Sequence, residues 1–556
     1  MPNINDINGV TIANLSKLDG VTKANIAKVL GITLEAAAAF LLDTYTGAAA
    51  GYSVRRIASS ATNLMRIRED SGDTETDIGY DSNGDLDLAA IASHCGTANG
   101  FVVSWVDQSG NGNDADQSTT TSQPKIYDGT TQAVVTENNE PALDFDGTNA
   151  LNISVTGTVT NFTAFFVRGF ATYPNTFQNG FHYKARGIGY NQSGGSGYKI
   201  AHLINGTAAV QRADSYPTTT GQSLDYFLNQ SELYRNSAAQ TLQSGTGYTA
   251  NTTSVIGGWK ESSQNITATI QELIIYESDE SSNRTGIETN INSEYLIYQP
   301  TDAPTSGLLA TYTGAAAAYS VRQLSDKAVI AITVRRDSDD EEKRFGFDSN
   351  GDLDSTGIAD FCTTANGYVS QWWDQSTNGN HASQGTAASQ PQIYNGTAVL
   401  TENGKPIIVP SANDTLSTTG IDFTSANTFA FVGTQATGVG VNVLSMDGTP
   451  LYVTTSGSTS DCTFGFSPTP VYYHNGTEQT TTPTRGEAYT FLSASQRLLT
   501  SVFGDRAGTD VVLGREVGQQ MASSQELIIW LTDQESAGNR TGIETDIDNY
   551  YAIPGI

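Results

Sequence analysis

Short runs in which apolar and polar residues alternate fill most of this chain, and such alternation is typical of β-strands separated by turns. The clearest example, residues 265–276, places six side chains on one face of a strand: Ile266, Ala268, Ile270, Glu272, Ile274 and Tyr276. Residues 161–171 and 426–435 are rich in Phe and predict core strands. The pattern predicts an all-β protein built from two-sheet sandwiches.

Helical spacing is confined to a few segments. Apolar side chains four residues apart predict a helix that closes each half of the chain, through Ile287, Ile291 and Tyr295, and through Ile543, Ile547 and Tyr551. Residues 33–45 predict a further helix, with Thr33 as its N-cap.

A long internal repeat organises the chain. WVDQSGNGNDADQ begins at Trp105 and WWDQSTNGNHASQ begins at Trp372, 267 residues later, and residues 44–129 recur at this offset without a gap. A period this long indicates tandem domains. We expect an N-terminal segment at 1–40, a first β-sandwich at 41–298, a linker at 299–307 and a second β-sandwich at 308–556.

The N-terminal segment carries a smaller repeat, with Gly9, Gly20 and Gly31 eleven residues apart. Each unit combines a Gly turn, a Thr suited to an N-cap (Thr11 or Thr22) and one or two apolar-lined turns. A unit this short cannot bury its own apolar face, so it is expected to pack on a neighbour. We interpret residues 1–40 as an anchor of short turns and helices, which favours a homo-oligomer or a larger assembly.

Charge and composition narrow the classes of partner. The formal net charge of −30 argues against nucleic acid and anionic membranes as partners. No apolar run is long enough to predict membrane insertion. The N-terminus lacks the basic and apolar regions of a secretory signal. Cys95 and Cys362 are repeat equivalents, so we expect the three cysteines to be small buried residues.

The string DSNGDLD occurs once in each copy and alternates oxygen-bearing side chains as a calcium loop does, at Asp81, Asn83, Asp85, Asp87, Asp348, Asn350, Asp352 and Asp354. It lacks the Gly and the Glu that complete an EF-hand loop. The alternative is an Asx-type turn that leads into a helix. Calcium is the one cofactor that the sequence leaves open.

Glu272 and Glu526 lie in phase with apolar neighbours, so each is expected to be buried and paired. Arg284 and Arg540, a short way downstream, are the predicted partners. The five histidines show no metal spacing and no triad.

Residues 45–56, 101–117 and 123–129 resemble the catalytic domain of fungal-type α-L-arabinofuranosidase B, with DQSGNGN as the most specific string. The resemblance covers the first half of each copy and implies a concanavalin A-like jelly roll. The copies also resemble laminin-G-like modules of phage and marine bacterial surface proteins. Residues 7–32 resemble the leader of virion structural proteins of marine tailed phages.

Glycosidase chemistry is not expected to accompany the resemblance. A retaining glycosidase needs two carboxylates about 5 Å apart. The family places its acid after a Gly-Gly pair, but Trp259 follows Gly257-Gly258, and Arg515 follows Leu513-Gly514. Glu261 and Glu516 are the nearby carboxylates that could substitute. DQSGNGN itself is interpreted as a turn that locks a strand end, with a carbohydrate-facing loop as the alternative.

These observations predict a non-enzymatic protein of the virion surface, released by host lysis. Residues 1–40 would bind other virion proteins, and two lectin-like domains would decorate the capsid or form part of a tail fibre, with host surface glycans open as ligands. An exported glycan-binding adhesin is the first alternative, and an arabinofuranosidase-like hydrolase is the second.

Overall fold

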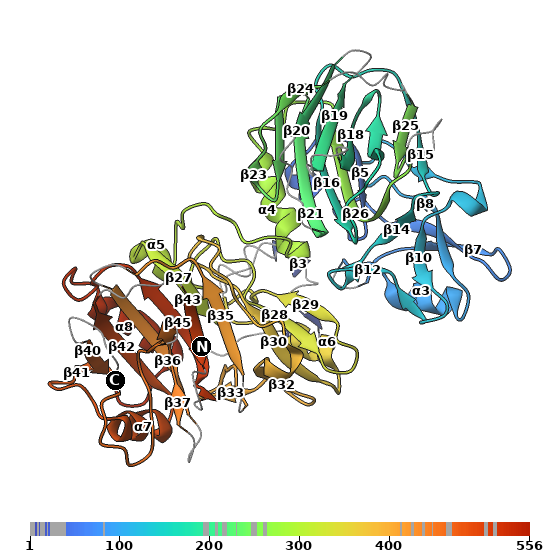
Figure 1. Cartoon of the computed structure of the whole chain (residues 1–556). Helices are drawn as coiled ribbons and strands as arrows, with labels where there is room; N and C mark the ends of the chain where they lie inside the picture. The colour runs from blue at the N-terminus through green and yellow to red at the C-terminus, as the bar shows by residue number, and fades with distance from the viewer. Residues whose placement is uncertain are drawn as a thin grey trace.

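The computed structural model shows a mostly β-sheet protein with several antiparallel sheets (Figure 1). It describes residues 6–7, 10–11, 17–18, 21–22, 40–81, 84–192, 199–205, 209–213, 220–229, 231–245, 253–258, 264–411, 414–423, 427–435, 440–446, 449–462, 470–504, 510–514 and 520–556. No helix among these residues is long and apolar enough to cross a membrane.

The described residues form two separate hydrophobic cores. The first joins buried side chains between Leu41 and Ile297, and the second joins buried side chains between Leu308 and Ile553. Figure 1 shows the corresponding two lobes, connected near helix α4 (Arg284–Tyr295). Residues 41–298 and 308–556 are called the first and second copy below.

The first copy is built on a ladder of antiparallel strands in the order β5 (Ala48–Ser53), β26 (Thr267–Tyr276), β16 (Thr163–Phe170), β21 (Gly221–Leu228) and β22 (Glu232–Arg235). A second ladder runs β15 (Leu151–Thr156), β25 (Thr253–Ile256), β17 (Gln178–Tyr183), β18 (Arg186–Gln192), β19 (Lys199–Asn205) and β20 (Ala209–Ala213). A third runs β7 (Glu75–Ile78), β6 (Met65–Glu69), β8 (Gly100–Trp105), β10 (Lys125–Asp128) and β14 (Leu143–Asp146).

The second copy repeats the first ladder as β27 (Ala315–Ser320), β45 (Ser523–Trp530), β36 (Asn427–Thr434), β42 (Arg497–Phe503) and β40 (Val471–His474). Its other strands include β29 (Glu342–Phe345), β28 (Ile332–Arg336), β30 (Asn366–Trp372) and β32 (Gln392–Asn395), and then β35 (Thr415–Thr419) and β43 (Asp510–Gly514). The remaining helices are α2 (Leu41–Thr44), α3 (Leu88–Cys95), α5 (Leu308–Thr311), α6 (Ser355–Cys362), α7 (Arg485–Ala494) and α8 (Arg540–Tyr551).

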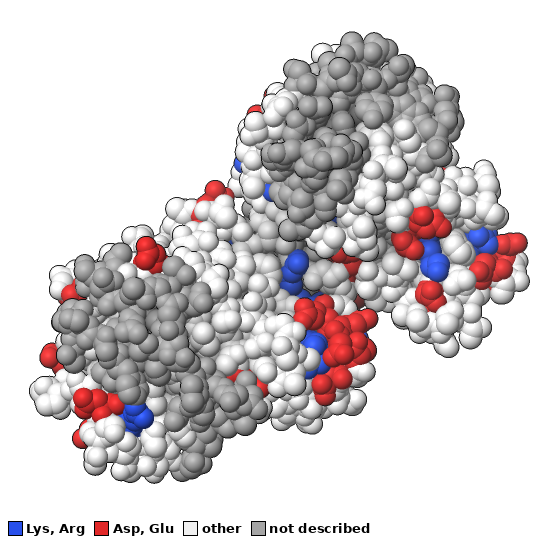
Figure 2. Space-filling view, in the orientation of Figure 1, with Lys and Arg blue, Asp and Glu red and all other residues white. Residues whose placement is uncertain are grey.

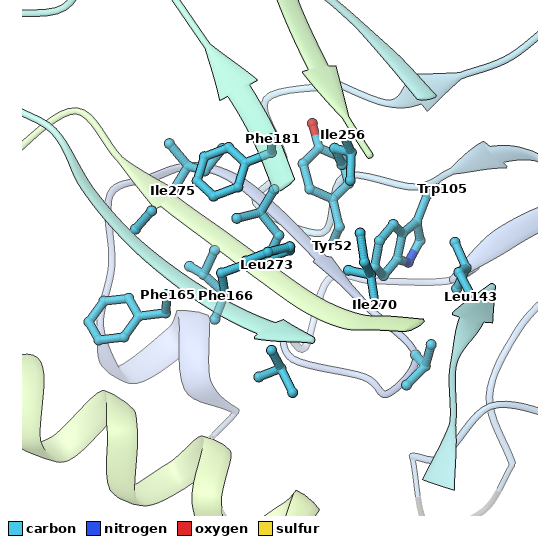
Figure 3. Packing of buried hydrophobic residues seen from close by; sticks show 14 of the residues in the cluster. Tyr52, Trp105, Leu143, Phe165, Phe166, Phe181, Ile256, Ile270, Leu273 and Ile275 are labelled. Atoms are coloured by element: carbon cyan, nitrogen blue, oxygen red, sulfur yellow. The ribbon is translucent and has the colours of Figure 1, made fainter. Parts of the chain in front are cut away.

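Strand β26 is buried on the face that the sequence predicts and, over part of its length, on the opposite face as well. The face of Ile266, Ile270 and Glu272 is buried as expected, and from Ile270 onward the opposite face is buried too. Figure 3 shows Ile270, Leu273 and Ile275 of this strand among core aromatic side chains such as Phe166 and Phe181. The alternation did not predict the second buried face, because a central strand covered on both sides loses its polar face.

The predicted closing helices are confirmed as α4 and α8, whose isoleucines at the predicted positions are buried. The three cysteines are free and buried, as predicted. In the N-terminal segment the structure describes two small antiparallel pairs eleven residues apart, β1 (Asp6–Ile7) with β2 (Val10–Thr11) and β3 (Lys17–Leu18) with β4 (Val21–Thr22). Thr33 and the first turns of the third predicted helix lie outside the described residues.

Candidate functional site

The DQSGNGN turn holds the edge of strand β5. The buried Asp107 carboxylate accepts hydrogen bonds from the backbone N–H groups of Gly51 at 2.9 Å, Ser109 at 2.9 Å and Asn113 at 3.0 Å. Asn111 Nδ2 donates to the Ala48 carbonyl oxygen at 2.9 Å. The motif therefore ties its own turn to a strand more than 50 residues earlier.

The second copy repeats these bonds. Asp374 accepts from the backbone N–H groups of Ala318 at 2.8 Å, Ser376 at 2.8 Å and Asn380 at 3.0 Å. Gln375 Nε2 donates to the Arg322 carbonyl oxygen at 3.0 Å. The interpretation of the motif as a strand-locking turn is confirmed, because its polar atoms are bonded to the protein itself.

A buried polar cluster lies beside each turn. In the first copy, the fully buried Glu272 carboxylate lies 3.0 Å from Arg55 Nε and accepts from Ser53 Oγ at 2.6 Å. The Tyr295 hydroxyl donates to the same carboxylate at 3.2 Å. Burial, and after it the Glu272 charge, raises the pKa of Tyr295 well above its usual value, so this hydroxyl keeps its proton.

The second copy reproduces the cluster with Glu526, which lies 2.8 Å from Arg322 Nε and accepts from Ser320 Oγ at 2.7 Å and Tyr551 Oη at 3.2 Å. Paired, buried glutamates are confirmed. The predicted partners were wrong.

Arg284 and Arg540 instead bind Glu288 and Glu544, four residues later on α4 and α8, with Arg284 Nη1 2.5 Å from the Glu288 carboxylate. Each of these arginines is paired with a glutamate one turn later on its own helix. The strand glutamates pair instead with Arg55 and Arg322, which follow the ends of the neighbouring strands β5 and β27.

The residues of the DSNGDLD string form turns and helix caps. In the first copy, Asp81 accepts from the backbone N–H groups of Gly84 and Asp85, both at 3.1 Å, and Asp87 caps α3 by accepting from Ala90 N at 2.9 Å. Asn83 lies outside the described residues.

In the second copy, Asp348 accepts from Asn350 N at 2.8 Å and Asp352 N at 3.0 Å, and Asp354 caps α6 by accepting from Gly357 N at 2.8 Å. The Asx-turn alternative is confirmed. Throughout the described part of the chain, no group of three or more His, Cys, Asp or Glu side chains is arranged to hold a metal ion. Calcium binding stays a prediction.

A polar cavity lies between the two copies. It has a volume of about 410 Å³, and its lining includes Glu140 and Glu294 from the first copy and Lys343, Arg344 and Asp348 from the second. Lys343 Nζ lies 2.7 Å from the Glu140 carboxylate, so an ion pair bridges the copies. Figure 2 shows Asp and Glu side chains gathered close to this junction, with a few Lys and Arg among them.

Burial dominates the electrostatics of the cavity. It raises the pKa of Glu294 to about 7 against the opposing effect of Arg55, and Asp85, Glu140 and Glu272 add to the rise. Burial likewise raises the pKa of Glu140, although Lys343 opposes the rise. Glu294 and Glu140 are therefore closer to protonation at neutral pH than carboxylates at an open surface, whereas hydrogen bonds lower the pKa of Asp326 and Asp348 on the other side of the cavity.

Sequence reasoning missed Glu140, Glu294 and Lys343. A signal was available in the repeat, because Glu294 stands where the second copy has Tyr550, and Glu140 stands where it has Lys405. Differences of charge between aligned copies mark positions where the copies face different surroundings. The predicted positions of the glycosidase acid, Trp259 and Arg515, lie outside the described residues, as do Glu261 and Glu516.

The class that the fold defines is a mostly β-sheet protein with several antiparallel sheets. No protein-family model matches the chain, and no curated protein matches it. Among solved structures, a GH54 α-L-arabinofuranosidase soaked with a cyclic sulfate inhibitor matches with a TM-score of 0.34 and 14% identity, over 63% of this chain and 79% of that one.

An arabinofuranosidase complexed with arabinofuranosyl-α-1,2-xylobiose matches with a TM-score of 0.33 and 16% identity, over 65% of this chain and 85% of that one. Trypanosoma rangeli sialidase in complex with sialic acid matches with a TM-score of 0.23 and 13% identity, over 34% of this chain and 31% of that one. This likeness concerns the β-sheet fold alone.

Proposed function

We propose that this chain is a non-catalytic structural protein of a virion surface, which residues 1–40 anchor and which displays two tandem concanavalin A-like sandwiches of the laminin-G type. The sandwiches would decorate a capsid or form part of a tail fibre. Host surface glycans are the ligands that this role would add.

The observation that carries the proposal is that the glutamates of the two polar clusters are buried and bonded within their own copy. A glycosidase directs two carboxylates at an open site where substrate enters. Glu272 and Glu526 are instead fully buried, and each is bonded to an arginine, a serine and a tyrosine of its own copy. Groups used in this way stabilise a scaffold, which favours display over catalysis.

The anchor role draws on the two short antiparallel pairs near the N-terminus. Each strand has only two residues, and an isolated two-stranded hairpin is marginally stable in water. Such a segment gains stability by packing on a sister chain or on other virion proteins. The net charge of −30 favours protein and glycan partners over nucleic acid.

Immunogold electron microscopy of phage particles from the source culture tests the proposal, with antibody raised against the second copy. Gold on the head supports a decoration protein, and gold on fibres or tail tips supports a tail protein and directs attention to glycan arrays. Absence of gold from every particle overturns the virion assignment. Release of nitrophenol from an arabinofuranoside substrate would overturn the non-catalytic assignment.

A further inference from the structure

The segment that leaves the first copy is bound to the second copy through a glutamine side chain. Gln299 Oε1 accepts from the backbone N–H groups of Val329 at 2.8 Å and Ile330 at 2.9 Å, and Gln299 Nε2 donates to the Ile330 carbonyl oxygen at 3.0 Å. A carboxamide suits this loop because it carries an acceptor oxygen and a donor nitrogen side by side. In the second copy the chain itself therefore fills a binding site for an amide.

The face around this loop is covered by the same segment. Arg344 Nη1 donates to the carbonyl oxygens of Leu296 at 2.9 Å and Ile297 at 3.1 Å. Trp373 and His381 line a cavity together with residues 297–301, and the centres of their rings are 4.3 Å apart. An arginine and two aromatic rings thus complete the contact with the bound segment.

The first copy has the same loop in the same place. The repeat offset of 267 aligns residues 62–63 with residues 329–330. Leu64 N donates to the Ile78 carbonyl oxygen at 2.8 Å, and the aligned bond in the second copy has the same length. The backbone next to the loop is therefore held alike in both copies. We call the surface of the first copy around residues 62–63 the amide site.

The amide site is open to solvent in the first copy. Thr62 is exposed and Asn63 is half-buried, whereas Ile330 is fully buried. No hydrogen bond within the described residues engages the N–H groups of Thr62 and Asn63 or the Asn63 carbonyl oxygen. A cavity of about 470 Å³ lies beside the loop, and its lining includes Val106, which stands where the second copy has Trp373. Space and free backbone groups are thus available to an occupant.

Charge distinguishes this cavity from the occupied face of the second copy. Its ionisable lining residues are Arg66, Glu75, Asp77, Asp114 and Asp116. The residues aligned with them are Thr333, Glu342, Arg344, His381 and Ser383. The first set has four carboxylates against one guanidinium, a formal charge of −3, whereas the second set has one of each and is neutral when the imidazole is neutral.

The excess negative charge lies where the bound segment passes in the second copy. Asp77 takes the place of Arg344, and Asp114 takes the place of His381. Arg66 is bound to Asp77 at 2.7 and 3.2 Å, and within the described part of the chain Asp114 and Asp116 form no ion pair. The site therefore favours a cationic segment.

Two observations argue against this same protein as the occupant. Strand β7, which carries Glu75 and Asp77, lies on the far side of the first copy from the second (Figure 1), so the second copy of the same chain does not reach the site. Each chain has a formal net charge of −30, so a second chain is repelled from an acidic cavity.

We propose that the amide site binds an extended segment of a different protein, which presents a glutamine or asparagine side chain to the backbone of Thr62 and Asn63. One or two lysine or arginine side chains on the N-terminal side of that amide would face Asp77 and Asp114. The site is separate from residues 1–40 and from any glycan ligand, so this inference does not depend on the proposed function.

Fluorescence anisotropy of a labelled peptide with the full chain tests the proposal. The probe copies residues 296–301 with Leu296→Lys and Ile297→Lys, because these positions lie beside Arg344 in the second copy. We expect binding that weakens as salt is added. Gln299→Met in the peptide should weaken binding by at least about tenfold, because the hydrogen bonds of the carboxamide are lost.

Variants of the chain locate the binding. Asn63→Pro removes one of the two N–H donors. The double variant Asp77→Asn, Asp114→Asn removes two charges and keeps the Asp114 side-chain oxygen that accepts from Asp107 N at 2.8 Å. Each should weaken binding by at least about threefold. Glu478→Gln, at an exposed position on β41 (Thr477–Glu478), is the matched control and should bind as the natural chain does.

Absence of binding by the lysine peptide overturns the proposal. Equal affinity for the peptide with Gln299→Met overturns it without any variant of the chain, so a folding defect in Asn63→Pro does not decide the outcome. Equal affinity for the unaltered 296–301 peptide overturns the cationic partner. Self-association of the natural chain in sedimentation velocity that Asn63→Pro abolishes would make a second chain the occupant and would also overturn the proposal.

Discussion

The Arg55 guanidinium lies 3.0 Å from the Glu272 carboxylate, and the two residues are joined across 217 positions of the chain. The side chain of Glu272 is fully buried and that of Arg55 is 11% exposed. The same pair recurs in the second copy as Arg322 and Glu526. A buried charge of this kind depends on its partner, because removal of one member leaves the other desolvated and unpaired.

Arg55→Met is therefore expected to destabilise the first copy by roughly 3–5 kcal/mol. Urea unfolding followed by tryptophan fluorescence measures the loss. Arg66→Met is the control, because the Arg66–Asp77 pair is about half exposed and solvent screens its attraction. The double variant Arg55→Met, Glu272→Met should recover much of the loss. A cost for Arg55→Met no larger than that of the control would contradict a structural role for the pair.

Asp107→Ala removes the acceptor of three backbone N–H groups, including that of Gly51 in β5. We expect a loss of about 3 kcal/mol or more, since donors left without an acceptor in a buried site cost their desolvation. Hydrogen–deuterium exchange of residues 48–53 should become faster. Asp360→Ala, at an exposed position on α6, serves as the control. Unchanged exchange at 48–53 would show that the turn does not hold this strand.

Calcium removal is expected to leave stability unchanged. Asp81 and Asp348 already accept from amides of their own turns, and Asp87 and Asp354 cap helices. Thermal unfolding in EDTA and in millimolar calcium should give the same Tm, because no ligand would then shift the folding equilibrium. A Tm that rises with calcium and loses this rise in Asp348→Ala would establish a metal site at the string.

His182 makes the first copy sensitive to acid. It is buried in β17, and desolvation by burial lowers the pKa of its imidazole to about 3. The folded form thus keeps a neutral ring while the unfolded chain takes up a proton below about pH 6.5. Stability is expected to fall as pH drops below that value, by up to about 1.4 kcal/mol per pH unit from this group.

His182→Gln should flatten this part of the stability–pH curve, and His94→Gln on the partly exposed helix α3 should not. Differences between each variant and the natural chain isolate the histidine from the carboxylates, which titrate in the same range. If both variants follow the natural curve, His182 does not carry the acid sensitivity.

The sequence alone determined the parts of this protein that depend on local pattern. The 267-residue repeat, the alternation along β26 and the four-residue spacing in α4 and α8 identify the strands, the closing helices and the duplication. The turns at Asp81 and Asp348 were also accessible, because an Asx turn uses amides within a few residues.

Tertiary structure alone decided which distant groups meet. Glu272 pairs with Arg55, which lies just past the end of the adjacent strand β5, and not with Arg284, since strand neighbours are set by sheet order and not by separation along the chain. The cavity at Glu140, Glu294 and Lys343 exists only where the two copies meet. Periodicity along the sequence shows which face of a helix or strand is buried. It does not show which other part of the chain packs against that face.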